Sequence, residues 1–133
     1  MIKYHAGYKY TLAESYSIQT AIRPERMAVT DFIVLDTDGL LHIRAGCPWD
    51  GPSGPTFDDD SNMRASLVHD ALRRLQRMGQ LDMKYLREVH RAYYDICIEC
   101  GMPEIRADYH YAAIKKVDRT NEPNESDIVL TAP

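Results

Sequence analysis

The chain of 133 residues has the length of one domain and can bury a hydrophobic core without a disulfide or a structural metal. Hydrophobic residues make up 44% of it and charged residues 27%, which is typical of a globular protein. The net charge of -4 argues against a nucleic-acid partner, which needs a basic surface, and against docking on anionic membranes. Since no apolar run could cross a membrane and the first residues lack the apolar core of a signal peptide, we expect no membrane insertion.

The N-terminal third of the sequence predicts strands. Tyrosine, threonine, serine and isoleucine are frequent over residues 8–20, which indicates one or two short strands. Residues 32–35 and 40–44 form two apolar runs, and the Asp38-Gly39 step between them favours a tight turn. We therefore expect an antiparallel hairpin here.

Residues 46–60 form a long segment with three prolines, three glycines and the single tryptophan, Trp49. This composition predicts an irregular loop. Long loops inside compact domains are often functional, and this one carries Asp50 and Ser53.

Helical periodicity begins after the loop. Three helices are predicted, over residues 62–78, 82–100 and 105–117. Ser61 or Asn62 is the expected N-terminal cap of the first helix, and Asp82 is the expected N-terminal cap of the second. A glycine follows the C-terminal end of each of these two helices. The expected apolar positions are Leu67, Val68, Ala71, Leu72, Leu75 and Met78 in the first helix and Leu86, Val89, Tyr93, Ile96 and Cys100 in the second.

Strands that precede helices predict an α+β fold: an N-terminal antiparallel β-hairpin or meander followed by a three-helix segment, as a single domain over residues 1–117. From Asp118 the composition becomes polar, which predicts an extended tail over residues 118–133. Within this tail, residues 128–130 are apolar and are expected to dock as a strand, on the same domain or on a neighbouring protein.

Two histidines are placed where the predicted helices meet. His69 lies at the margin of the first helix's apolar face, whereas Asp70 lies on its polar face, so the two side chains diverge. His90 lies along the apolar stripe of the second helix. If these helices form an antiparallel pair, His69 and His90 approach one another.

Asp50 could complete a set of one carboxylate and two histidines with His69 and His90. Such a set suits zinc with an open position for water, so zinc is the cofactor to consider. The alternative is structural: Asp50 accepts backbone hydrogen bonds in a turn, and each histidine is satisfied inside the helix packing. Both interpretations stay open on the sequence alone.

The remaining candidates carry weaker signals. Ser53 could present a hydroxyl beside Asp50, but the chain lacks the Gly-x-Ser-x-Gly turn of many serine nucleophiles, which favours an orienting role. Cys97 and Cys100 have the spacing of a redox or zinc half-site. Because cysteine is among the most buried residue types, core packing is the favoured role, and three cysteines with no signal peptide indicate reduced thiols.

The loop and the helix after it resemble a known family, the phage and prophage proteins grouped as domain of unknown function 1353. The matching positions are Gly46, Trp49-Asp50-Gly51-Pro52-Ser53, Pro55, His69-Asp70, Leu72, and the segment from Gly101 through Ala107 to Tyr111. The resemblance covers roughly residues 30–117 and implies that Asp50, Ser53, His69 and Asp70 share one neighbourhood.

One departure from the family pattern concerns the second helix, where the family tends to carry an aspartate and this chain has His90. If the position is a metal ligand, histidine keeps a metal site feasible but makes it softer. If the residue only pairs with His69 in the fold, the substitution weakens the catalytic interpretation.

Two hypotheses on function follow. The first is a phage-encoded, metal-dependent or acid/base hydrolase of cell-wall peptide or glycan, in which Asp50, His69 and His90 bind metal or move protons and Ser53 or Asp70 orients them. The second is a virion-associated structural or interaction protein, in which the loop and the His69-Asp70 helix form a structural polar network and the tail contacts other virion proteins or a second copy. Both predict a protein made in the host cytoplasm, and the second also predicts a place in the virion.

Overall fold

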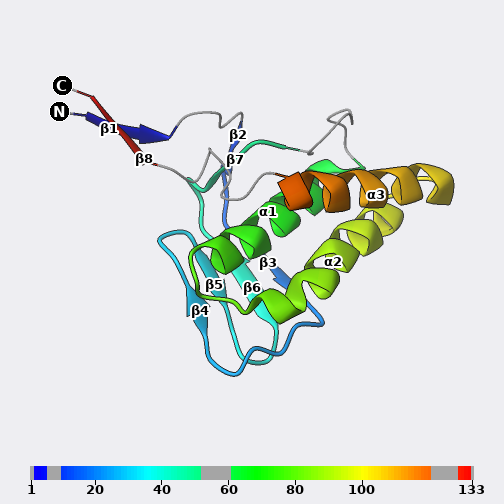
Figure 1. Cartoon of the computed structure of the whole chain (residues 1–133), viewed down its shortest axis with the longest axis horizontal. Helices are drawn as coiled ribbons and strands as arrows, with labels where there is room; N and C mark the ends of the chain where they lie inside the picture. Colours follow the sequence, from blue (N-terminus) through cyan, green and yellow to red (C-terminus); the bar gives the residue numbers. More distant parts are fainter. Residues whose placement is uncertain (1, 6–9, 52–60, 121–128, 133) are drawn as a thin grey trace.

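The computed structural model describes residues 2–5, 10–51, 61–120 and 129–132, and it confirms the α+β prediction (Figure 1). Antiparallel strands come first and three α-helices follow. The strands are β1 (Ile2–His5), β2 (Tyr10–Thr11), β3 (Tyr16–Gln19), β4 (Ala28–Val29), β5 (Ile33–Leu35), β6 (Leu40–Ile43), β7 (Pro48–Trp49) and β8 (Val129–Ala132). The helices are α1 (Met63–Arg77), the short 3-10 helix η1 (Met83–Tyr85), α2 (Leu86–Glu99) and α3 (Glu104–Thr120).

The central sheet has four strands in the order β3-β6-β5-β4. Strands β5 and β6 form the expected hairpin, with Leu35 opposite Leu41. Gly39 closes its turn with a φ of 91° and donates a backbone hydrogen bond to the Asp36 carbonyl at 3.0 Å. A Cβ atom at this position would lie 2.6 Å from the Ile22 carbonyl oxygen, so glycine is required both for the backbone angle and for space.

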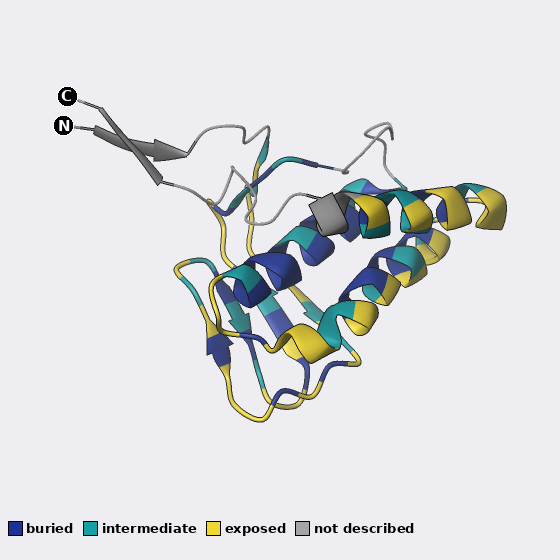
Figure 2. Ribbon diagram, in the orientation of Figure 1, coloured by how far each residue is buried: buried dark blue, intermediate teal, exposed yellow. Residues whose placement is uncertain are grey.

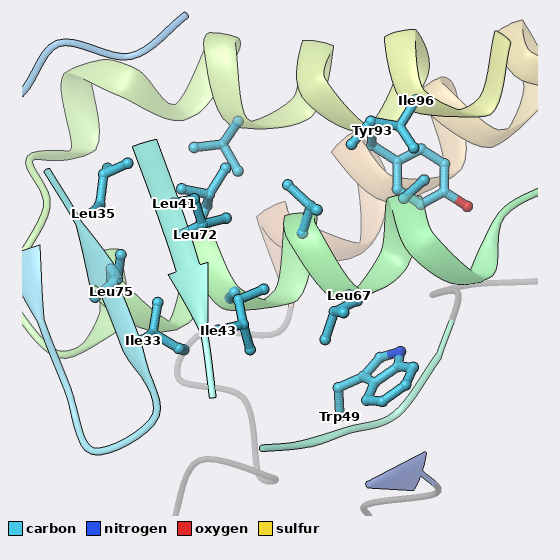
Figure 3. Packing of buried hydrophobic residues seen from close by; sticks show 14 of the residues in the cluster. Ile33, Leu35, Leu41, Ile43, Trp49, Leu67, Leu72, Leu75, Tyr93 and Ile96 are labelled. Atoms are coloured by element: carbon cyan, nitrogen blue, oxygen red, sulfur yellow. The ribbon is translucent and has the colours of Figure 1, made fainter. Parts of the chain in front are cut away.

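Helices α1 and α2 lie over one face of this sheet, and α3 packs on α2 (Figure 1). Apolar side chains of β5 and β6 point toward α1, where they meet Leu72 and Leu75 (Figure 3). Helix α1 is buried along almost its whole length, whereas α2 and α3 expose their outer faces (Figure 2). The core is therefore a layer between the sheet and the helices, with α1 at its centre.

Some details of the helices differ from the predictions. Met78 is 57% exposed, because α1 ends at Arg77 and the chain turns away at Gly79. Asp82 does cap a helix, since its carboxylate accepts from the Lys84 N–H at 2.8 Å, but that helix is the short η1 that precedes α2.

The buried face of α2 is wider than the predicted stripe. Cys97, outside the predicted stripe, is completely buried, whereas Cys100, which the stripe includes, is only half-buried. The reason is that α2 packs against both α1 and α3, so its buried face is wider than one stripe and includes His90 and Cys97.

The two ends of the chain form a separate antiparallel ribbon. Strand β1 pairs with β8, with Ile2 opposite Ala132 and His5 opposite Val129 (Figure 1). The apolar part of the predicted tail thus docks on its own chain, through Val129 and the residues after it. Helix α3 continues to Thr120, beyond its predicted end at residue 117. Within the described residues, no helix is long and apolar enough to span a membrane.

Neighbouring leucines in β6 test the position of the core. Leu41 is fully buried, whereas Leu40 is 38% exposed. We expect Leu41→Ala to lower the free energy of unfolding by about 2–5 kcal/mol, because it removes buried methyl groups and leaves a cavity. Leu40→Ala should change it by only about 0.5 kcal/mol. Urea unfolding monitored by circular dichroism measures both, and equal losses would contradict the sheet register.

Candidate functional site

The loop segment that carries Asp50 is fixed onto α1 through β7. The Trp49 indole Nε1 donates to the Ser66 hydroxyl at 3.2 Å, and the Arg74 guanidinium donates to the Pro48 carbonyl at 2.8 Å. Ser66 and Arg74 lie two turns apart on one face of α1, so the segment is held at two points along the helix. Asp50 follows directly and is half-buried.

Arg74 links three parts of this region. Besides the Pro48 carbonyl, its guanidinium binds the Asp70 carboxylate at 3.3 Å and the Cys47 sulfur at 3.6 Å. Burial raises the pKa of the Cys47 thiol, and the nearby Arg74 charge opposes that shift only in part. Cys47 is therefore a protonated, buried thiol at neutral pH, and Asp70 forms a partly buried ion pair on the polar face that the sequence predicted for it.

The central feature of the candidate site is a direct contact between two buried histidines. His69 Nε2 lies 3.0 Å from His90 Nδ1, and their rings stack with an angle of 21° between planes. Only 6% of His69 and 5% of His90 is exposed. One of the two facing nitrogens donates a hydrogen bond to the other, and the tautomers of the two rings decide which one, so the bond joins α1 to α2.

The contact continues into α3 through Tyr93. The Tyr93 ring meets His69 edge-on, and its hydroxyl hydrogen-bonds to His110 Nδ1 at 3.0 Å. Tyr93 is 1% exposed and His110 is 3% exposed. We call His69, His90, Tyr93 and His110 the histidine network; it crosses the interior from α1 to α3.

A second buried polar group lies one turn further along α1. Arg73 is completely buried and donates to Gln76 Oε1 at 3.0 Å, while Gln76 Nε2 donates to the Asp82 carbonyl at 3.1 Å. These bonds attach the C-terminal end of α1 to the segment that leads into η1. An arginine is rarely buried to this extent without specific partners, so Arg73 is part of the architecture of the site.

The structure brings together some of the predicted site residues. His69 and His90 meet as the helix pairing predicted, and the bonds of β7 to α1 place the Asp50 segment along the same helix. Among the described residues, however, no three histidine, cysteine, aspartate or glutamate side chains are grouped so that they could hold a metal ion. The zinc set of Asp50, His69 and His90 is therefore not formed here. Ser53 lies outside the described residues.

Sequence reasoning missed Arg73, Arg74, Tyr93 and His110 as members of this region. Helical spacing carried a signal for two of them, because Arg73 follows His69 by four residues and Arg74 follows Asp70 by four. Tyr93 was predicted only as packing, and the link to His110 depends on how α3 docks, which no local pattern predicts.

Comparisons with known proteins do not place the chain in a family: no family model, no curated protein and no solved structure matches it. The resemblance to domain of unknown function 1353 therefore stays a prediction.

A double-mutant cycle on His69 and His90 tests whether their contact exists in solution. Each of His69→Ala and His90→Ala should lower the free energy of unfolding by about 1–3 kcal/mol, because each leaves a buried partner without its bond. The double variant should lose less free energy of unfolding than the two single variants lose together, with a coupling energy of at least about 0.5 kcal/mol.

The exposed cross-strand bond between Ser17 and His42, at 2.7 Å, is a matched control for this cycle. Its coupling should be smaller, because water replaces an exposed hydrogen bond at little cost. Strictly additive losses at His69 and His90 would mean that the two rings are not in contact.

Proposed function

We propose that the protein is a small phage-type hydrolase in which His69 and His90 form the acid/base couple. The observation that carries this proposal is the 3.0 Å contact between His69 Nε2 and His90 Nδ1. Histidine is the side chain most often used to move protons near neutral pH. An imidazole that takes a proton from an attacking water becomes a cation and leaves a hydroxide to attack the substrate, and the neighbouring imidazole stabilises that cation by accepting the hydrogen bond between the two rings.

The surroundings support the assignment of roles. Tyr93 meets the His69 ring edge-on and holds its orientation, in the way that second groups orient catalytic histidines. The Asp50 carboxylate is the candidate for positioning water, because β7 is bonded to the same helix that carries His69. The proposed substrates are cell-wall peptides or glycans, whose hydrolysis needs a proton for the leaving amine or sugar oxygen.

A purified cell-wall preparation tests the proposal directly. We expect the wild-type protein to release soluble fragments from dye-labelled sacculi. His69→Gln and His90→Leu should slow this release by about a hundredfold or more, because each removes one half of the hydrogen-bonded pair. The assay should be run at a temperature where both variants are folded by circular dichroism, with His42→Gln, a histidine outside the network, as the control.

Two further measurements sharpen this test. His90→Asp places the residue of the resembled family opposite His69, and it should retain more activity than His90→Leu because a carboxylate can also accept the hydrogen bond. Elemental mass spectrometry of the untagged protein reports whether zinc is present. A wild type without activity, or a His69→Gln variant that keeps it, would contradict the hydrolase.

A second candidate is a virion-associated interaction protein without catalysis. It is favoured by the β1–β8 ribbon, which joins the two ends of the chain outside the four-stranded sheet. A two-stranded ribbon has two edges with unpaired backbone groups, and such edges accept further strands from partners or from a second copy. In this proposal the histidine network only fixes the fold.

Thr131 in β8 tests the ribbon. Thr131→Pro removes a backbone donor from the strand and should reduce the amount of the protein in purified virions severalfold, because it disrupts the edge offered to a partner. Thr131→Val, which keeps the β-branched shape, is the control. Quantitative mass spectrometry of virions gives the amounts, and absence of the wild type from virions would contradict this candidate.

A further inference from the structure

A cavity of about 220 Å³ lies between the edge strand β3 and helix α2. Its floor consists of Ile22, Val68 and Ile96, which are all buried. Its walls include Ile18 from β3 and Ala92 from α2. This cavity contains none of the histidines and none of the residues proposed for hydrolysis, so it needs a separate explanation.

The strand on one side of the cavity has an open edge. Among the strands that the structure describes, β3 is the last in the order β3-β6-β5-β4, so β6 pairs with only one of its sides. The Thr20 N–H bonds to the Gly39 carbonyl at 2.9 Å, in the same register that pairs Ile18 with Leu41. Because bonding alternates along an antiparallel strand, the main chains of Ser17 and Gln19 face the open edge.

The helix on the other side lines the cavity with an excess of negative charge. Glu88, Asp95 and Glu99 contribute three carboxylates, and Arg91 contributes one cation. Arg91 is paired with Asp95 at 3.1 Å, and Glu99 is paired with Arg64 at 3.2 Å. Within the part of the chain that the structure describes, Glu88 forms no ion pair, and it is exposed.

We propose that this groove binds an extended basic segment of a partner protein, which adds as a strand to β3. Strand addition supplies backbone bonds at Ser17 and Gln19, and alternate side chains of the added strand point into the cavity. An apolar side chain in the middle fits the floor of Ile22, Val68 and Ile96. Basic side chains two residues before and after it lie near the carboxylates of α2, whose charge they complement.

The smallest segment with this pattern has five residues, with a basic residue, an apolar residue and a basic residue at alternate positions. Its backbone advances about 13 Å from the first residue to the last.

A titration followed by amide chemical shifts in the full chain tests the proposal. The probe is the capped peptide Lys-Thr-Val-Thr-Lys, and its charge-reversed counterpart is Glu-Thr-Val-Thr-Glu. We expect millimolar or tighter binding of the basic peptide, with shifts concentrated in β3 and on α2 between Glu88 and Glu99. Glu88→Gln should weaken binding about two- to fivefold, as expected for one partly exposed charge pair. Glu14→Gln, at an exposed site outside the groove, should not.

Methylated probes separate strand addition from simple charge attraction. Methyl groups on the peptide amides that face β3 should abolish binding, whereas methyl groups on the alternate amides should leave it within about twofold. The proposal is overturned if the basic peptide does not bind, if both peptides bind equally, if both methylation patterns have the same effect, or if the shifts map to another surface.

Discussion

The burial of α1 is the constraint on which the rest of the structure depends. The sheet covers one side of this helix, α2 covers another, and the segment through β7 covers a third. Yet α1 carries buried polar side chains, among them Ser66, His69 and Arg73. A buried polar group costs free energy unless it is hydrogen-bonded, so each must find a partner on a neighbouring element.

Through these partners, the polar residues of α1 attach neighbouring elements to the helix. Ser66 and Arg74 hold the segment before Asp50, His69 holds α2, and Arg73 acts with Gln76 to hold the chain that leads into η1. Their bonds are directional, so they select one orientation of each neighbour where apolar packing would accept several. The same directionality would serve a reaction, since a proton donor is useful only when it is held in place. At His69, the same hydrogen bond therefore serves both the fold and the proposed chemistry.

Local chemistry made part of this architecture predictable. The Asp38-Gly39 turn, the three helices and the approach of His69 to His90 follow from patterns within short segments. The β1–β8 ribbon pairs residues from opposite ends of the chain, and no local pattern encodes such a register. Burial of Arg73 was equally hidden, because arginine normally lies at the surface and only the assembled partners make its burial favourable. The third member of the predicted zinc set is hard to place for a related reason: two helices fix two histidines, but a third ligand depends on the path of a loop.

Helix α2 contributes to both the proposed hydrolase site and the proposed peptide-binding groove. Its inner face carries His90 and Tyr93 of the histidine network, and another face carries Glu88 and the other charged residues that line the groove beside β3. Val68, in the floor of the groove, directly precedes His69 on α1. A hydrogen bond weakens steeply with distance and angle, so a segment that wedges β3 and α2 apart would act on the pair of histidines without touching it. Conversely, variants at exposed Glu88 and buried His90 change different faces of one helix. A variant at Glu88 should therefore change peptide binding and leave hydrolysis unchanged, and a variant at His90 should do the reverse, unless α2 itself moves.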